Sequence, residues 1–393
     1  MSVANLNPVP PRLQALFFIS YLKVYIRIII VLMIIVNILY SGLGGHSSVV
    51  FPFIEADEKK QYRHILIFYG IENMPQSYID KCRELSIPFF FVKKEQGLDM
   101  ASQKKIIGIL KEVMPDIILL HSVNLILPVY LHAITKGIRI ISIEHQSNKL
   151  KSKKDWIWSR MVMLLSRKVV YLTDLYAEQM KDHLGLFYAD KKVRVINNGI
   201  NTTLFSPANK LNNENNSIGM LARLSPTKEH ITLVEAFKML LDKDPGLHNL
   251  RLKIAGDGEM KETIQQKVKS LGISGSVDFL GMLPEHLCAV FLNELTIYVH
   301  VSLGETMSTS LMQAMACGKP IIASDVDGIN NMITHGETGI LVPVKNMEEL
   351  ANAMEKLLQD PNMRDRLGRN AVEYARRHFT SQAMFIKYEQ LFV

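Results

Sequence analysis

The chain has 393 residues, of which 48% are hydrophobic and 21% are charged. This length exceeds what one hydrophobic core commonly serves, so two domains are expected, and the composition is that of a globular protein. The three cysteines are odd in number and lack the spacing of a metal or redox motif, which excludes a disulfide framework and favours a reducing compartment.

The charge is distributed unevenly along the chain. The formal net charge is +7 overall, but it is +11 over residues 1–210 and −4 over residues 211–393. A basic half predicts a domain that faces a negatively charged surface. Because no nucleic-acid-binding motif with interleaved aromatic residues accompanies this charge, a membrane surface explains more of the pattern than nucleic acid does.

The first long apolar stretch is Leu13–Val36, which is interrupted by Lys23 and Arg27. Each cation inside a spanning helix costs about 2.5–3.5 kcal/mol. On a helix over residues 12–27, the basic side chains share one face, which favours an amphipathic extension lying in the membrane interface over residues 1–27. A buried strand at Ile28–Leu39 would follow. A true membrane span and an ordinary core helix are the alternatives.

Apolar runs alternate with helical patterns along both halves of the chain, which predicts two α/β domains with parallel sheets. In the first half, strands are expected at Ile28–Leu39, Ile65–Tyr69, Phe89–Val92, Ile117–Leu120, Ile138–Ile143, Val169–Leu172 and Val193–Ile196. In the second half, they are expected at Ile218–Leu221, Leu252–Ala255, Val277–Leu280, Ile297–His300, Ile321–Ala323 and Gly339–Val342.

The domain boundaries follow from this pattern. The first Rossmann-like domain is predicted over residues 28–205, a linker rich in asparagine over 206–217, the second Rossmann-like domain over 218–362 and closing helices over 363–393. The two domains face each other, and ligands are expected in the cleft at the carboxyl ends of their strands.

A basic segment at Lys149–Lys168 contains both tryptophans, Trp156 and Trp158, beside an apolar run. Tryptophan and cations flanking apolar residues are typical of a membrane-surface patch. A solvated basic loop followed by a core helix is the alternative.

Two candidate site elements follow strands of the first half. The loop Gly42–Gly45 allows close approach of the backbone to a phosphate, although it lacks dinucleotide-binding spacing and can also be a plain turn. His145 follows the strand Ile138–Ile143 directly, at the expected cleft, where a histidine is a functional candidate.

Two candidate elements follow strands of the second half. Arg223 and Lys228 lie five residues apart in one loop, so they can converge on a diphosphate; two solvated surface charges are the alternative. Gly256–Glu259 follows the next strand and is interpreted as a structural turn that opens a helix.

The segment His300–Gly328 predicts a strand, a tight loop, a helix and a second strand. The loop holds one carboxylate, Glu305, and the helix begins in a Ser/Thr cluster around Ser308 and ends at Gly318. A loop that leads into a helix N-terminus presents free N–H groups to an oxygen-rich anion. Glu305 is therefore a candidate site residue.

Together these motifs resemble the retaining glycosyltransferases of the family 4 type, which have the GT-B fold and use nucleotide-sugar donors. The resemblance covers residues 28–380 and is stronger from residue 197 onward. It includes Asn198–Pro207, Ile254–Glu259 and Val277–Gly281. The family signature is a glutamate, seven residues and a second glutamate, whereas this chain has Glu305, seven residues and Gln313.

The resemblance implies a role for each candidate residue. Glu305 would contact hydroxyls of the transferred sugar, and Arg223 and Lys228 would neutralise the departing diphosphate. The backbone of Thr306, Met307 and Ser308 would help to hold the donor, His145 would lie near its sugar, and Gly44 and Gly45 would approach the phosphate or the acceptor. Gln313 would bind the ribose hydroxyls without the charge of the family's glutamate, so activity is expected to persist with weaker or altered binding of the donor.

The resemblance further implies a retaining hexosyl- or N-acetylhexosaminyl-type transferase without a metal ion or another cofactor, and a UDP- or GDP-linked donor. The basic, membrane-facing first domain favours a lipid-linked glycan acceptor in surface polysaccharide or lipopolysaccharide biosynthesis. The expected location is cytoplasmic, peripheral on the membrane. Alternatives are a catalytically silent nucleotide-sugar-binding partner, suggested by Gln313, and a sugar-nucleotide epimerase.

Overall fold

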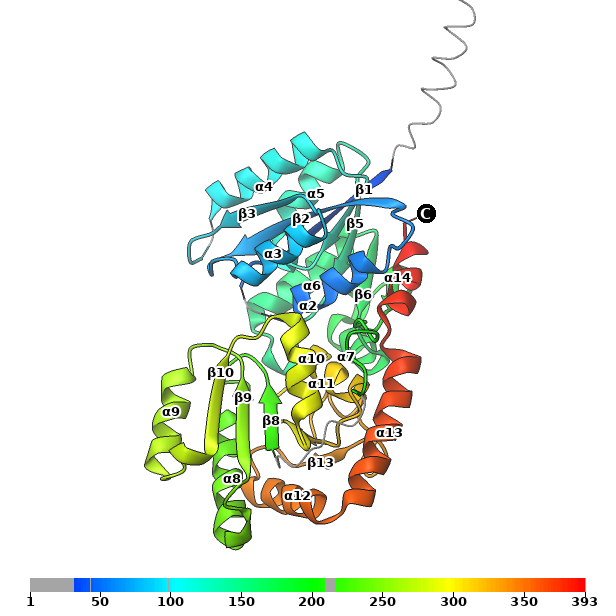
Figure 1. The fold of residues 1–393 in the computed structure, drawn as a ribbon. Coiled ribbons are helices and arrows are strands. Elements are labelled where there is room, and N and C mark those ends of the chain that lie inside the picture. Colours follow the sequence, from blue (N-terminus) through cyan, green and yellow to red (C-terminus); the bar gives the residue numbers. More distant parts are fainter. Residues whose placement is uncertain (1–31, 43, 98, 209–216, 393) are drawn as a thin grey trace, which may run out of the picture.

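The computed structural model describes residues 32–42, 44–97, 99–208 and 217–392. They form two lobes, one above the other in Figure 1, and each lobe holds a parallel sheet flanked by helices. The predicted fold class, two facing Rossmann-like domains, is confirmed. The predicted extension over residues 1–27 and most of the predicted linker over 206–217 lie outside the described residues.

The first sheet has the strand order β3-β2-β1-β4-β5-β6-β7, and the paired strands are parallel. Its strands are β1 (Met33–Tyr40), β2 (Tyr62–Gly70), β3 (Phe89–Lys93), β4 (Ile117–Leu120), β5 (Arg139–Ile143), β6 (Lys168–Tyr171) and β7 (Val193–Val195). The helices of this lobe are α2 (Gly45–Glu55), α3 (Gln76–Glu84), α4 (Met100–Val113), α5 (Ile126–Ala133), α6 (Lys153–Leu165) and α7 (Asp174–Leu184). Short 3-10 turns include η1 (Val123–Leu125), η2 (Asn148–Leu150) and η3 (Gly185–Phe187).

The second sheet has the order β10-β9-β8-β11-β12-β13, again with parallel pairs. Its strands are β8 (Ser217–Leu221), β9 (Arg251–Ala255), β10 (Val277–Gly281), β11 (Ile297–His300), β12 (Ile321–Ser324) and β13 (Ile340–Val342). Its helices are α8 (His230–Lys243), α9 (Lys261–Ser270), α10 (Glu285–Glu294), α11 (Thr309–Ala316), α12 (Met347–Gln359) and α13 (Pro361–His378), and α14 (Ser381–Glu389) follows.

The first strand corrects one sequence-based expectation. Within the described residues it runs from Met33 to Tyr40, so it begins later than the predicted Ile28 and ends one residue beyond Leu39. Met33–Val36 pair with β2, and therefore no single helix runs through Leu13–Val36. In the ranges that the structure describes, no helix is both long enough and apolar enough to cross a bilayer.

The basic segment Lys149–Lys168 folds largely into α6, which begins with a capping box between Ser152 and Asp155. Both tryptophans pack against the apolar core, and the Trp156 ring stacks on the ring of His183 with 4.3 Å between centroids. Lys151 is buried against Glu144. The two tryptophan rings therefore belong to the packing of the lobe, as the core-helix alternative expects, because composition alone does not show which face of a helix such rings occupy.

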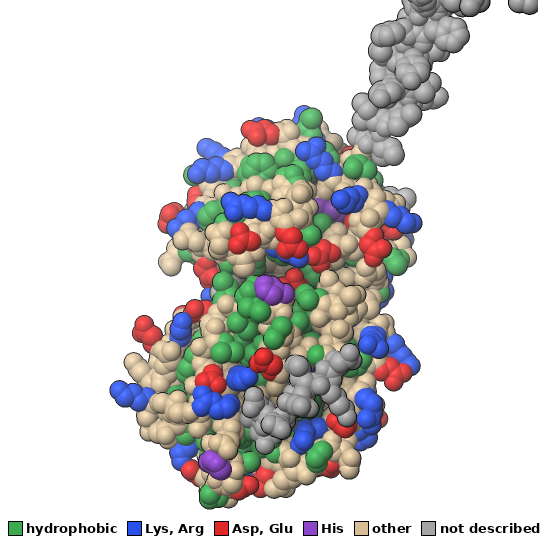
Figure 2. Space-filling view, viewed as in Figure 1, with side chains coloured by type: hydrophobic (Ala, Val, Ile, Leu, Met, Phe, Trp, Pro, Cys, Tyr) green, Lys and Arg blue, Asp and Glu red, His purple; other side chains and the backbone are tan. Residues whose placement is uncertain are grey.

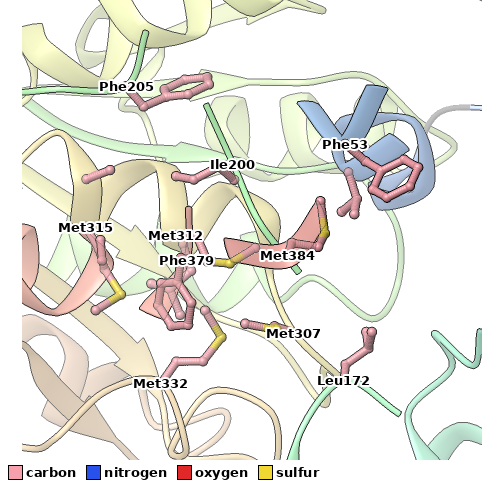
Figure 3. Packing of buried hydrophobic residues seen from close by; sticks show 14 of the residues in the cluster. Phe53, Leu172, Ile200, Phe205, Met307, Met312, Met315, Met332, Phe379 and Met384 are labelled. Atoms are coloured by element: carbon pink, nitrogen blue, oxygen red, sulfur yellow. The ribbon is translucent and has the colours of Figure 1, made fainter. Parts of the chain in front are cut away.

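A methionine-rich cluster joins the two lobes, and Figure 3 shows it from close by. The backbone N–H groups of Asn198 and Gly199, where the chain leaves the first lobe, donate to the sulfur atoms of Met307 and Met384 at 3.2 and 3.1 Å. At the other end of the chain, α13 packs against α11 and α12, whereas α14 lies against α2 of the first lobe. The lobes are thus connected at two crossings of the chain.

Candidate active site

In each sheet the strand order reverses its direction at one point. This switch point lies between β1 and β4 in the first lobe and between β8 and β11 in the second. In parallel sheets, ligands bind at the carboxyl ends of the strands beside such a switch point. The segments that leave these four strands contain the glycine loop, His121, Arg223 and Glu305. The space-filling view shows the surface hollowed between the lobes (Figure 2).

Glu305 and Lys228 are in contact at the carboxyl end of β11. Both side chains are mostly buried, with 14% and 17% exposure, so the two charges compensate each other where water is scarce. His300, fully buried at the end of β11, places Nε2 3.0 Å from Glu305 Oε1, and its Nδ1 lies 3.2 Å from the Tyr298 hydroxyl. A neutral His300 can make both contacts when its Nε2–H donates to Glu305 and its Nδ1 accepts the Tyr298 hydroxyl. The hydrogen bond to Glu305 then holds the carboxylate in position.

The backbone brings these two charges together. The Leu303 N–H and the Ser302 hydroxyl both donate to the Thr227 carbonyl, at 2.9 and 3.2 Å, so the loop of Glu305 is tied to the loop of Lys228. Gly328 supports the Glu305 loop from the other side: its φ is +82°, and a Cβ there would lie 2.3 Å from the Glu305 carbonyl oxygen. Only glycine fits this position without displacing the loop.

The sequence places Arg223 and Lys228 in one loop, but the ion pairs of Arg223 lie apart from the contact between Lys228 and Glu305. Its Nη2 instead lies 2.8 Å from Glu72 Oε1 of the first lobe and 3.4 Å from Glu259 Oε2. The predicted turn at Gly256–Glu259 supports the Arg223 loop, since a Cβ on Gly256 (φ +137°) would lie 1.9 Å from the Ala222 carbonyl oxygen. Arg223 therefore reaches across the cleft from a rigid loop.

The residues after Glu305 divide between the cleft and the core. Ser308 is the N-cap of α11, and its hydroxyl accepts the Leu311 N–H, as predicted. The Thr306 hydroxyl donates to the His145 carbonyl oxygen at 2.6 Å and so connects the two lobes beside the site. The Met307 side chain packs into the methionine-rich cluster, which leaves its backbone for any ligand contact. Gln313 is buried within α11.

His145 belongs to a group of three histidines that the sequence did not reveal as a unit. The His145 Nε2 lies 2.9 Å from His121 Nδ1, and the ring of His46 lies 4.3 Å from that of His145. Asn37 Oδ1 lies 3.3 Å from His121 Nε2. If Asn37 Oδ1 accepts the Nε2–H of His121, then the Nδ1 of a neutral His121 accepts the Nε2–H of His145. These two hydrogen bonds fix the tautomers of His121 and His145. Burial lowers the pKa of His46 to about 4 and those of His121 and His145 well below 6.5, so all three rings are neutral near pH 7.

The glycine loop leads directly into a helix. Gly45 is the first residue of α2 and Gly44 is its N-cap, with an extended backbone. A Cβ added to Gly44 would meet no heavy atom within 4 Å. The backbone at Gly44 therefore has open space beside it, which is the property that a close approach of a ligand to the backbone requires.

A small pocket between the lobes contains further residues that sequence reasoning missed. Its lining includes Ser147, Asn148, Gln179, Glu305, Thr306 and Asn331. Among the described residues, Asn148 Oδ1 and both side-chain polar atoms of Asn331 are buried without a hydrogen-bond partner. Buried polar atoms without partners are costly, so these amides are poised to bind hydroxyl groups of a ligand beside Glu305. No sequence pattern marks either asparagine.

No group of three His, Cys, Asp or Glu side chains that could hold a metal ion is found in the part of the chain that the structure describes. The three histidines lie close together, but they contact one another through a hydrogen bond and through their rings.

Comparison with known families gives two adjoining matches. Residues 43–204 match the model "Glycosyltransferase Family 4", and residues 201–374 match "Glycosyl transferases group 1". Among curated proteins, the chain is 30% identical over 215 residues to D-inositol 3-phosphate glycosyltransferase of Corynebacterium glutamicum, a match that covers 51% of each chain. It is 28% identical over 351 residues to exopolysaccharide phosphotransferase SCO2592 of Streptomyces coelicolor, covering 87% of this chain and 36% of the relative. The chain thus matches about half, or less, of the length of these curated relatives.

Solved structures share the fold over nearly the whole chain. HepE of Anabaena in complex with UDP and glucose aligns with a TM-score of 0.77 and 17% identity, covering 92% of this chain and 99% of HepE. Sucrose-phosphate synthase of Thermosynechococcus elongatus aligns with a TM-score of 0.76 and 17% identity, covering 92% and 98%. At this level of identity the likeness shows the fold.

Proposed function

Because the chain belongs to the glycosyltransferases of the family 4 type, with the GT-B fold, we propose that it transfers a sugar from a nucleotide-diphosphate sugar to a glycan acceptor and retains the anomeric configuration. The observation that carries this proposal is the buried contact between Glu305 and Lys228 at the switch point of the second sheet. It supports the proposal because a carboxylate can accept sugar hydroxyls and a cation can bind phosphate, and a nucleotide-linked sugar presents both hydroxyls and a diphosphate.

The donor would replace interactions that the site makes within itself. A diphosphate entering between the lobes would take Arg223 from Glu72 and Lys228 from Glu305, which frees Glu305 for the sugar hydroxyls. Asn331 and Asn148 offer further partners for those hydroxyls. The HepE structure is described with UDP and glucose, which supports a UDP-linked donor; a GDP-linked donor is the alternative.

In the proposed reaction, the bond between the anomeric carbon and the diphosphate breaks, and charge accumulates on the leaving oxygens. Arg223 and Lys228 stabilise that charge, so the reaction as proposed uses no metal ion and no other cofactor. His145 holds a neutral ring beside the sugar in an orientation that His121 fixes. We favour attack by an acceptor hydroxyl on the face that the leaving group vacates, through a short-lived oxocarbenium-like species. The hydroxyl proton passes to the departing phosphate oxygen, and the configuration is retained.

For the acceptor, we propose a lipid-linked glycan in surface polysaccharide or lipopolysaccharide biosynthesis, and for the transferred group a hexosyl or N-acetylhexosaminyl unit. The basic first lobe supports an acceptor at a negatively charged surface, and the protein would act peripherally on the cytoplasmic face of the membrane. The name of one curated relative mentions exopolysaccharide, and one structural relative is described as a lipopolysaccharide outer core galactosyltransferase.

The function is tested by a thermal-shift screen of UDP, GDP and their sugars, followed by product analysis with the donors that bind. A donor that binds the folded protein raises the unfolding midpoint by mass action. We expect one nucleotide-diphosphate sugar to stabilise the protein and to release its nucleotide on addition of a glycan acceptor. A donor epimerised without acceptor would instead indicate an epimerase, and a donor that binds unchanged in every mixture would indicate a silent binding partner.

Replacing Gln313 by glutamate is expected to strengthen donor binding and leave turnover intact. A carboxylate accepts a ribose hydroxyl more strongly than an amide does, by roughly 1 kcal/mol, so the KM for the donor should fall about fivefold. Steady-state kinetics measure this, with Gln266→Glu on the exposed face of α9 as the matched control. If Gln313→Glu abolished turnover in a folded protein, the assigned role of Gln313 would be wrong.

Activity should fall in alkaline solution because Lys228 loses its proton. Burial lowers the pKa of Lys228 to about 8, so the protonated form that neutralises the diphosphate predominates below this pH and disappears above it. We expect kcat/KM for the donor to decline about tenfold per pH unit above pH 8. The profile is measured from pH 6.5 to 9.5. Arginine stays charged over this whole range, so the Lys228→Arg variant should not show the decline in kcat/KM above pH 8. If the decline persists unchanged in this variant, another group causes it.

A further inference from the structure

The solvent-facing side of α5 is aliphatic along its whole length. Leu127, Leu131 and Ile134 are 41%, 59% and 60% exposed, and their spacing of four and three residues aligns them on one face. Across α5 itself there is no Asp, Glu, Lys or Arg. Surface leucines scattered singly are ordinary, but an apolar face that covers a whole helix marks an interaction site.

The neighbouring helix α6 continues this surface with alternating cations and aliphatic side chains. Lys153, Ile157, Arg160 and Leu164 follow one another at spacings of four, three and four residues, and all four are exposed. Helix α6 packs against both α5 and η3. The surface formed by the exposed sides of α5, α6 and η3 is therefore continuous, and we call it the basal face.

At its η3 edge the basal face ends in two apolar side chains. Leu186 is fully exposed and Phe187 is 48% exposed, and the Arg160 guanidinium lies 5.7 Å above the Phe187 ring. An aromatic ring beside a cation at the surface is an arrangement that suits the boundary between lipid headgroups and acyl chains.

The surroundings of the basal face are strongly cationic. Residues 100–168, from α4 to the start of β6, contain 12 Lys/Arg and 4 Asp/Glu, a formal net charge of +8. Glu144 and Lys151 are buried against each other and cancel within this sum, so the net charge of +8 lies on the remaining residues, and one of their three acids, Asp155, caps α6. The excess positive charge of the first half of the chain is thus concentrated around the same helices that expose aliphatic side chains.

We propose that the basal face docks the first lobe on an anionic lipid bilayer. The aliphatic side chains enter the headgroup region, and the surrounding cations contact the lipid phosphates. This inference rests on the peripheral membrane association in the proposed function and deepens it by locating the contact. Because α5 begins five residues after His121, the docked face reaches the mouth of the cleft, where a lipid-linked acceptor would enter.

The amino end of β1 lies at the same end of the lobe as part of the basal face. The apolar stretch that starts at Leu13 leads into Met33 at the amino end of β1. At this end of the sheet the Ile34 N–H donates to Asp116, which directly precedes β4. Ile134 and Leu164 also lie toward this end, because α5 and α6 finish there before β5 and β6 begin. Met33 thus lies at the same end of the lobe as Ile134 and Leu164 of the basal face.

Co-sedimentation of the full chain with vesicles tests the proposal. We expect binding to vesicles of phosphatidylglycerol and phosphatidylcholine, none to phosphatidylcholine alone, and release by 0.5 M salt, as screening predicts. The triple variant Lys153→Gln/Lys154→Gln/Arg160→Gln should lose about fivefold in partitioning for each cation removed, roughly 10²-fold in all. The double variant Leu131→Ser/Ile157→Ser should also bind at least tenfold more weakly.

The matched control is Leu287→Ser/Val290→Ser on α10 of the second lobe, two apolar side chains with exposures of 41% and 50%. This variant should bind vesicles like the parent protein. If basal-face variants bind unchanged while the parent binds, another segment makes the contact and the proposal is wrong, although membrane association stands. If the parent protein does not bind vesicles, both the basal-face proposal and the proposed peripheral membrane association are wrong. Donor turnover then still tests the proposed transfer reaction separately. A change in oligomeric state without a change in vesicle binding would make the basal face an interface between copies of the chain.

Discussion

Replacing Glu305 by glutamine should lower kcat/KM for the donor sugar by about 10²-fold or more, the largest effect that we expect of any conservative substitution. The carboxylate is proposed to accept hydroxyls of the transferred sugar, and a hydrogen bond to a charged group contributes about 1.5–3 kcal/mol. Two such bonds account for a loss of this size. The exchange also removes the negative partner of Lys228, which a bound diphosphate replaces.

Binding of nucleotide and binding of sugar separate this role from a structural one. Glu305→Gln should bind the nucleoside diphosphate about as well as the parent protein does and lose only the gain from the sugar, as measured by calorimetry. Glu337→Gln is the control, since Glu337 is exposed on the same lobe. Parent-like turnover of the nucleotide-sugar by Glu305→Gln would remove Glu305 from the sugar site.

Replacing Gly328 by alanine should reduce activity by more than tenfold although the residue touches no substrate in the proposed reaction. The added methyl group would lie 2.3 Å from the Glu305 carbonyl oxygen, so the loop that carries the carboxylate must shift. A displacement of about 1 Å in a catalytic group is known to cost roughly 10²-fold in rate. Donor kinetics and the free energy of unfolding should both be measured.

Gly336→Ala provides a matched control for backbone strain. Gly336 has a similar φ of +78°, yet an added Cβ would meet no heavy atom within 4 Å. Both variants should lose about 1–2 kcal/mol of stability through the left-handed backbone, but only Gly328→Ala should lose activity. Equal activities would show that the Glu305 loop tolerates the displacement and that its position is less critical than we infer.

The fold was predictable because buried parallel strands appear as short apolar runs in the sequence. The predicted bounds of Ile117–Leu120 and Ile297–His300 coincide with β4 and β11, and Ser308 caps α11 as its hydroxyl predicts. In these places the local sequence and the tertiary environment demand the same structure. Trp156 shows the opposite case: its neighbours suggest a surface, but packing against His183 decides its position.

The candidate site was predictable only where a residue carries its own signal. Glu305 and Lys228 stand out as charges in loops after strands, and the structure brings them into contact. The pair Arg223–Glu72 joins residues 151 positions apart, and no local pattern indicates such a contact. Asn331 and His121 were missed for a related reason, since one polar residue among apolar ones acquires meaning only through its spatial neighbours.

The two sulfur contacts where the chain leaves the first lobe bear on how the lobes are held together. A thioether is a weak acceptor on a flexible side chain, so the N–H groups of Asn198 and Gly199 are held more loosely than they would be by carbonyl oxygens. A hinge at this crossing would also include the neighbouring backbone pair, in which the Ile200 N–H donates to the Phe379 carbonyl oxygen at 2.8 Å and the Ser381 N–H donates to the Ile200 carbonyl oxygen at 3.0 Å. Oxidation of Met307 or Met384 to the sulfoxide would place a strong acceptor at that hinge and stiffen it.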